Sequence, residues 1–187
     1  MDAMDAQIAE HIRCAEALRG QTALLEAIVA ALIRCFHRGG RLYVLGNGGS
    51  AADAQHIAAE LVGRFKRNRR PLPAIALTTD TSVLTAVGND LGAEEVFRRQ
   101  VQALVRPEDV VWALSVSGTS PNVIAALASA REAGATCIGF TGRGGGRFPE
   151  YCALCLRADH TASDRVQETH QLAYHLVCDA VEAHFAG

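Results

Sequence analysis

The sequence predicts a flavodoxin-like α/β domain, a three-layer α/β/α sandwich in which helices cover both faces of a five-stranded parallel sheet. Three observations support this prediction. Short runs of strand-forming residues alternate with helical patterns from residue 41 onward. These runs are apolar throughout, which is typical of strands that are covered on both faces. Two of them end in loops of small and hydroxyl residues that lead directly into a helix, where sheets of this type bind ligands.

The first 38 residues precede this alternation and predict two helices, over 3–18 and 21–38. Apolar residues recur at helical spacing in both, for example at Ile8 and Ile12 in the first. Gly39 ends the second helix and leads into the first strand. The first helix is an extra N-terminal element, and its apolar stripe fits either packing on the chain's own core or pairing with another subunit.

The α/β core is expected to run from 41 to 187, and the whole chain, 1–187, to form one domain, because 187 residues with 49% hydrophobic content can bury one core. Periodicity and turn residues divide this core into strands and helices. The predicted strands are 42–46, 73–78, 109–115, 135–141 and 152–156, and the predicted helices are 51–65, 82–88, 93–104, 121–133 and 163–185.

Charge and composition argue against nucleic-acid and membrane partners. The net charge is −2, which provides no basic surface for nucleic acid. The basic cluster Arg64–Arg70 is interpreted as a solvated helix end and loop. The sequence has neither an apolar run of membrane-spanning length nor a signal-peptide pattern, so we expect a soluble, cytoplasmic protein.

The six cysteines lie mostly within apolar helix or strand patterns, which favours buried thiols over the disulfides of a secreted protein. Cys152 and Cys155 have the spacing of half a zinc or redox motif. We expect both on one strand, where an odd separation directs them to opposite faces. The pair is therefore interpreted as structural.

The first candidate site is the turn Gly46-Asn-Gly-Gly-Ser50 and the helix after it. A strand, a glycine-rich turn and a helix N-terminus together present backbone N–H groups to an anion. The glycine spacing fits neither a dinucleotide fingerprint nor a P-loop. At about 100° per residue, Asp53, His56 and Glu60 share one stripe of the helix. His56 and Glu60 can converge on one proton or metal ion, although an exposed helical ion pair has the same spacing.

A second anion site is predicted at the loop Ser115-Val-Ser-Gly-Thr-Ser120, after the third strand. Ser120 suits the N-cap of the next helix and Pro121 its first position. The loop places several hydroxyls around a helix N-terminus, which suits a phosphate monoester, and a merely capped turn is the alternative. These hydroxyls belong to Ser115, Ser117, Thr119 and Ser120.

Polar residues elsewhere receive different interpretations. One side of the last helix carries amides and an imidazole, which favour a lined pocket over a solvent face. The segment Gly88-Asn89-Asp90 is interpreted as a turn, and Gly142–Arg147 as a flexible surface loop. The polar residues of the last helix are Asp164, Gln167, Gln171 and His175.

Together these motifs resemble the SIS (sugar isomerase) family, and more narrowly its phosphoheptose isomerases. The likeness runs in matching order from about residue 21 to the end of the chain. The motifs that carry it are Gly46–Ser50, His56-x-x-x-Glu60, Ser115–Ser120, and Asp164-Arg-Val-Gln-Glu168 with His175.

The resemblance implies a homotetrameric aldose–ketose isomerase that converts sedoheptulose 7-phosphate to D-glycero-D-manno-heptose 7-phosphate, the first step of nucleotide-activated heptose biosynthesis. Glu60 would be the base and His175 the acid, which agrees with the carboxylate and acid that such a proton transfer needs. Metal-binding members imply a zinc site at His56, Glu60, Gln167 and His175. The implied substrate contacts are Asn47, Gly48, Gly49, Ser50, Glu60, Asn89, Asp90, Ser115, Val116, Ser117, Ser120, Asp164 and Gln167.

Other functions remain open at this point. A non-catalytic SIS module could bind a phosphosugar or a protein, as a replication-initiator-associated relative does, but it would not need Glu60 and His175 facing one cleft. Another SIS sugar-phosphate isomerase is the second alternative. For the metal, Mn and Fe are alternatives to zinc, and a hydrogen-bonded polar cluster without metal is a third possibility.

Overall fold

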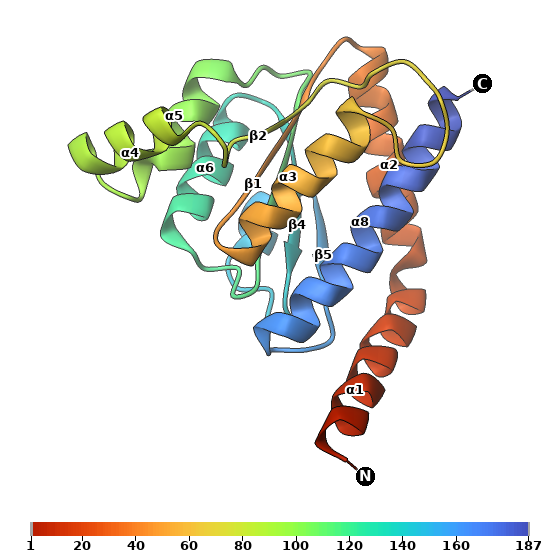
Figure 1. Cartoon of the computed structure of the whole chain (residues 1–187). Helices are drawn as coiled ribbons and strands as arrows, with labels where there is room; N and C mark the ends of the chain where they lie inside the picture. Colours follow the sequence, from red (N-terminus) through yellow and green to blue (C-terminus); the bar gives the residue numbers. More distant parts are fainter. Residues whose placement is uncertain (1, 187) are drawn as a thin grey trace.

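A computed structural model describes residues 2–186 and contains one parallel sheet between two layers of helices (Figure 1). The strand order is β2-β1-β3-β4-β5, which is the flavodoxin-like order and confirms the predicted fold class. The strands are β1 (Leu42–Gly46), β2 (Ala74–Ala76), β3 (Val110–Ser115), β4 (Thr136–Thr141) and β5 (Leu154–Arg157).

The helices cover both faces of this sheet. Helices α2, α3 and α8 pack on one face, and α5, α6 and α7 pack on the other, with α4 beside α5 (Figure 1). The short 3-10 helix Leu18–Gln21 joins α1 to α2. The helices are α1 (Ala3–Ala17), α2 (Thr22–His37), α3 (Gly49–Val62), α4 (Thr81–Asp90), α5 (Glu95–Leu104), α6 (Pro121–Glu132), α7 (Phe148–Tyr151) and α8 (Ser163–Phe185). None of the helices within residues 2–186 is both long enough and apolar enough to span a bilayer.

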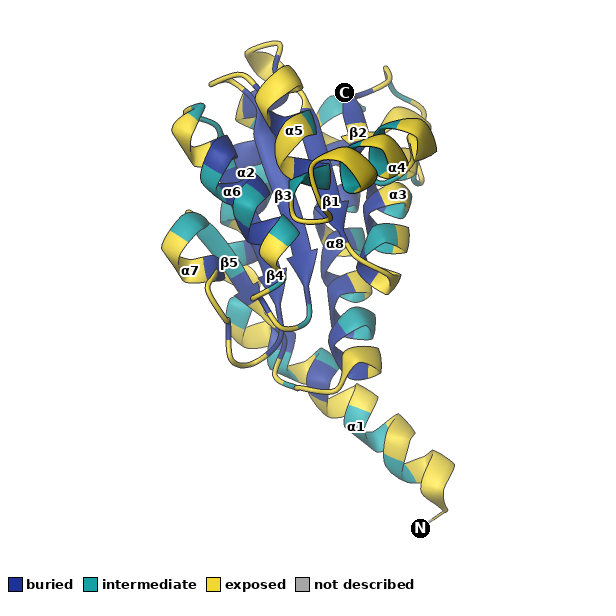
Figure 2. Cartoon of the chain, turned by 90° about the vertical axis from the view of Figure 1, so that its left-hand side faces the viewer, coloured by how far each residue is buried: buried dark blue, intermediate teal, exposed yellow. Residues whose placement is uncertain are grey.

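The central strands β1 and β3 are buried along their whole length, because each sends alternate side chains into a different layer (Figure 2). Val44 and Trp112 pack toward α2, α3 and α8, whereas Tyr43 and Val111 pack toward α5 and α6. Burial of each such side chain stabilises the fold by roughly 1.5–3 kcal/mol. The continuous apolar runs of the sequence reflect this two-sided burial.

Helix α1 extends away from the rest of the chain (Figures 1 and 2). Its C-terminal end is buried at Cys14, but Ile8 and Ile12 are 59% and 50% exposed. Packing on the chain's own core, one of the two expectations for this helix, therefore covers only part of its apolar stripe.

The expected strand 152–156 is shorter than predicted and begins at Leu154. The preceding residues form α7, which starts at the fully buried Phe148 and has Pro149 in its first turn, a position that favours a helix. Cys152 therefore lies outside the strand, and it packs with Cys155 against the same core cluster. The prediction that they face opposite sides is wrong. Burial raises the pKa of both thiols, which suits structural residues.

The segment Gly88-Asn89-Asp90 is the last turn of α4, so its interpretation as a turn is wrong. Asp80 caps the start of α4 by accepting a hydrogen bond from the Val83 N–H at 3.0 Å. The helix then continues through Gly88, which is tolerated in a helix at a cost of about 1 kcal/mol.

Candidate active site

The two predicted anion-binding loops lie next to each other because β1 and β3 are neighbouring parallel strands, with Gly46 paired to Leu114. Between the loops and the start of α8 is a pocket of about 240 Å³. Its polar lining comes mainly from side-chain hydroxyls and amides. The lining residues are Asn47, Ser50, Leu114, Ser115, Val116, Ser117, Ser120 and Gln167.

Three serine hydroxyls converge in this pocket. The Oγ of Ser115 lies 3.4 Å from that of Ser117 and 3.2 Å from that of Ser120. Ser120 occupies the predicted N-cap position of α6, but its hydroxyl does not cap the helix. The N-cap residue of α3, Gly48, has no side chain, so within residues 2–186 neither N-cap residue caps its helix, and the positive ends of both helix dipoles face the pocket. This arrangement favours an anion over a simple capped turn.

The first loop is held to α6 by an amide pair that the sequence analysis missed. Asn47 Nδ2 donates to Asn122 Oδ1, and Asn122 Nδ2 donates back to Asn47 Oδ1, both at 2.9 Å. A polar residue directly after Pro121 was the available signal for Asn122. Asn47 is thereby oriented at the edge of the pocket.

The glycine-rich loop Gly142–Arg147 supports the serine loop and is not the flexible surface loop that was expected. The Gly142 N–H donates to the Val116 carbonyl at 3.0 Å, and the Arg147 N–H donates to the Gly118 carbonyl at 2.8 Å. Gly118 has a φ of +64°, and a Cβ there would collide with the Gly145 carbonyl. Gly118 thus allows the two loops to approach this closely.

A second polar cluster lies where α3 and α8 run side by side (Figure 1). Within residues 2–186, one group of His, Cys, Asp or Glu side chains is arranged to share a metal ion, and it consists of His56, Glu60 and His175. His56 Nε2 lies 3.0 Å from Glu60 Oε1 and 3.5 Å from His175 Nε2. The Glu60 side chain is only 18% exposed, which argues against an ordinary surface ion pair. Burial, reinforced by His56, lowers the pKa of His175 although Glu60 acts in the opposite direction.

Behind His56 is a hydrogen-bonded chain that reaches into the protein. The Tyr174 hydroxyl lies 2.9 Å from His56 Nδ1 and donates to Asp53 Oδ1 at 3.4 Å. Burial raises the pKa of Asp53 to about 6, although the hydrogen bond from Tyr174 lowers it in part. The sequence analysis placed Asp53 on the same stripe as His56 but did not identify Tyr174, which lies in the apolar pattern of α8.

The basic cluster Arg64–Arg70 is not solvated throughout, contrary to its interpretation. Glu182 of α8 is fully buried and accepts three backbone N–H bonds, from residues 65–67, at 2.6–2.8 Å. The Arg69 side chain is also buried, 3.5 Å from Glu182, and donates to the Glu60 carbonyl at 2.7 Å. Phe65 is thereby held against His175, with ring centroids 5.3 Å apart and nearly parallel planes.

Gln167, near the start of α8, lines the serine pocket. Its amide lies directly against Gly49, at the start of α3, where a Cβ would displace it. Gln167 and His175 are about 12 Å apart along α8, since each residue advances the helix by about 1.5 Å. Gln167 therefore contacts the serine pocket and lies on the same helix as His175 of the polar cluster.

The residues that line the pocket do not include five other predicted contacts: Gly48 and Gly49 of the first loop, Asn89, Asp90 and Asp164. Asn89 and Asp90 are exposed at the end of α4, where they are hydrogen-bonded to each other at 2.7 Å. Helix α4 lies at the opposite side of the molecule from α8 (Figure 1). Asp164 is exposed as well, and its carboxylate accepts from the Arg165 backbone and side chain at 2.9 and 3.1 Å.

Comparison with known proteins agrees with this geometry. The SIS domain family model matches residues 8–142. A phosphoheptose isomerase of Roseiflexus sp. (strain RS-1) is 53% identical over 162 residues, which cover 87% of this chain and 82% of the relative. That of Geotalea uraniireducens (strain Rf4) is 47% identical over the full length of both chains. The structure of phosphoheptose isomerase from Neisseria gonorrhoeae superposes with a TM-score of 0.90 at 40% identity, covering 96% of this chain and 97% of that one. The chain therefore belongs to the SIS domain family and, within it, to the phosphoheptose isomerases.

Proposed function

We propose that this chain interconverts sedoheptulose 7-phosphate and D-glycero-D-manno-heptose 7-phosphate. The observation that carries this proposal is that the same two helices, α3 and α8, contribute to both sites: Ser50 and Gln167 line the serine pocket, and His56, Glu60 and His175 form the polar cluster. Ser50 and Glu60 are about 15 Å apart along α3, a distance that a seven-carbon sugar phosphate can bridge when both side chains reach inward. The names of the relatives support the same reaction.

The phosphate is proposed to occupy the serine pocket. The hydroxyls of Ser115, Ser117 and Ser120 can donate to phosphate oxygens, as can Ser50 and the backbone N–H groups at the starts of α3 and α6. Each hydrogen bond to a charged group contributes about 1.5–3 kcal/mol. The phosphate thereby anchors the substrate, while Asn47 and Gln167 lie beside the sugar hydroxyls.

The proton transfer is assigned to Glu60 and His175. Glu60 removes a proton from C1 of the ketose, and the electron pair forms the C1–C2 double bond of an enediol as O2 takes a proton from His175. Glu60 then returns the carbon-bound proton to C2 while His175 takes back a proton from O1, which leaves the aldehyde at C1 and restores both groups. General acid–base catalysis of this kind contributes about 10²–10⁴-fold.

Zinc is proposed as the resident metal ion, held by His56, Glu60 and His175, and the resemblance implies Gln167 as a fourth donor. Two imidazoles and a carboxylate within 4.8 Å of one another match the three protein ligands of catalytic zinc sites. When bound, the ion would polarise the substrate carbonyl and stabilise the negative charge of the enediolate. Elemental analysis of protein purified without chelator tests the site, since less than a tenth of an equivalent of transition metal in fully active protein would refute it.

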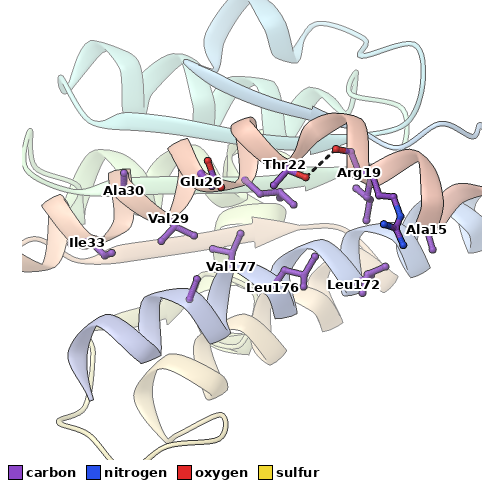
Figure 3. A pocket seen from close by; sticks show the side chains of 13 residues that line it. Ala15, Arg19, Thr22, Glu26, Val29, Ala30, Ile33, Leu172, Leu176 and Val177 are labelled. Carbon is purple, nitrogen blue, oxygen red and sulfur yellow. Dashed lines mark hydrogen bonds between the residues drawn. The ribbon is translucent and has the colours of Figure 1, made fainter. Parts of the chain in front are cut away.

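A homotetramer is also proposed. An apolar groove of about 620 Å³ runs between α2 and α8 near the end of α1 (Figure 3). Leu176 at its edge is 48% exposed, and large apolar residues of α1 such as Ile8 are exposed as well. Packing against other subunits would cover these side chains, and it could bring Asn89, Asp90 or Asp164 of one subunit to the site of another. A fully active monomer in light scattering would refute this assembly.

The six free thiols support a cytoplasmic location.

A coupled assay with sedoheptulose 7-phosphate, run with and without a chelator, tests the proposed reaction. We expect turnover, and loss of turnover on chelation that zinc restores. A panel of other ketose phosphates separates the other SIS isomerases, which would favour a different substrate. If no ketose phosphate is converted, the chain is a non-catalytic binding module and the proposal is wrong.

A further inference from the structure

We propose that Tyr174 is a positioning residue that, held by Asp53, fixes His56 in the tautomer whose unprotonated Nε2 faces Glu60 and His175. This inference rests on the proposed metal site, because it explains why the cluster is suited to a cation. It concerns two side chains outside the implied ligand set, one on each of the helices that carry the ligands.

The tautomer follows from the number of hydrogens that the Tyr174 hydroxyl can offer. The hydroxyl has one hydrogen and two neighbours, Asp53 Oδ1 at 3.4 Å and His56 Nδ1 at 2.9 Å. An ionised carboxylate can only accept, so the hydroxyl hydrogen points to Asp53. The phenol oxygen must then accept from His56 Nδ1–H. A neutral imidazole carries one proton, and its Nε2 therefore presents a lone pair.

The surroundings keep this chain in place. Tyr174 is fully buried, and its ring meets the ring of His56 edge to face, with centroids 5.4 Å apart. The second oxygen of Asp53, Oδ2, is buried and has no partner within residues 2–186. Burying a carboxylate that makes this single hydrogen bond costs free energy. The one hydrogen bond that Asp53 makes orients the tyrosine hydroxyl.

The tautomer decides what the cluster can bind. With the proton on Nδ1, His56 Nε2 cannot donate to Glu60 Oε1, although these atoms are 3.0 Å apart. The lone pair of His56 Nε2 then faces the lone pairs of Glu60 Oε1, and a cation between these two atoms relieves their repulsion. His175 Nε2, 3.5 Å from His56 Nε2, is close enough to share the cation. With the proton on Nε2, the imidazole would donate to Glu60 and the two groups would form a closed polar pair. Tyr174 thus decides whether His56, Glu60 and His175 form a cation site or a hydrogen-bonded cluster without metal.

The first test is the zinc affinity of Tyr174→Phe, measured by competition with a chromophoric chelator at pH 7.5. Removing the hydroxyl leaves the ring packing in place and frees Nδ1, so we expect affinity to fall about 10–100-fold, as is typical when the partner of a ligating histidine is lost. Tyr43→Phe is the matched control, because Tyr43 is equally buried but donates to the Leu104 carbonyl, outside the site. Its zinc affinity should be that of the wild type. Equal affinities in all three proteins would overturn the inference.

The second test reads the tautomer directly in the metal-free protein, by nitrogen-15 NMR of labelled histidine with the His56 signal assigned through His56→Gln. We expect a protonated Nδ1 in the wild type and a shift of the proton to Nε2 in Tyr174→Phe. Asp53→Asn is the second variant and should shift it in the same direction, because an amide can donate to the hydroxyl. A wild-type proton on Nε2, or no shift in either variant, would overturn the inference. Wild-type protein that binds no zinc would refute the metal site, while the NMR result still decides the role of Tyr174.

Discussion

We expect His170 to make the protein lose stability as the pH falls from about 6.5 toward 4. His170 is fully buried on α8 beside Phe140, and its Nε2 lies 3.2 Å from the Thr141 carbonyl oxygen. Its Nδ1 has no partner within the described residues. The loss of water lowers the pKa of His170 to about 4, although the hydrogen bond to Thr141 acts in the opposite direction.

The sign and size of the effect follow from this pKa. Above about pH 6.5 the imidazole is neutral in the folded and unfolded states, so its full contribution is present. Below that pH the unfolded chain binds a proton that the folded chain excludes, which favours unfolding. Between 6.5 and about 4 the pKa difference is about 2.5 units, or about 3 kcal/mol at about 1.36 kcal/mol per unit.

Urea unfolding of the wild type and His170→Gln at several pH values between 7.5 and 4.5 measures this effect. Glutamine can still donate to the Thr141 carbonyl but does not titrate, so the difference between the two proteins isolates His170 from the carboxylates. The two proteins are compared at one protein concentration, because association changes apparent stability. We expect the wild type to lose stability more steeply below pH 6.5. Parallel pH dependences would refute the argument.

Three further predictions concern the site and its support. Glu60→Gln should lower kcat by about 10²–10⁴-fold without unfolding the protein, because the amide cannot accept the proton, and retention of more than about a tenth of wild-type kcat would contradict its role as base. Ser117→Ala should raise KM for the sugar phosphate more than it lowers kcat, whereas Ser129→Ala, a buried serine on α6, should leave KM unchanged; equal KM values in both would move the phosphate elsewhere. Glu182→Gln should cost about 3–5 kcal/mol in chemical denaturation, because it leaves Arg69 buried without its partner, whereas Asp179→Asn, which breaks two partly exposed pairs, should cost about 0–1 kcal/mol per pair. A similar small loss in both variants would show that the buried pair does not hold α3 and α8 together.

Sequence alone predicts the order of the strands and of every α-helix except α7, the parallel sheet and the motifs of the site. Each of these is a local property. His56 and Glu60 lie one helical turn apart, and the serine loop lies within six consecutive residues, so backbone geometry alone brings their side chains together. The apolar runs of β1 and β3 similarly required burial on both faces.

The support of these motifs depends on contacts between segments that are far apart in the sequence. Tyr174 belongs by sequence to the apolar pattern of α8, and it becomes a polar partner because α3 brings His56 to its hydroxyl. Glu182 is 117 residues from Phe65, and no periodicity links a basic loop to a carboxylate at that separation. Side-chain partners across such distances depend on how the helices pack on the sheet, which is set by the shape of the whole core and not by any one segment.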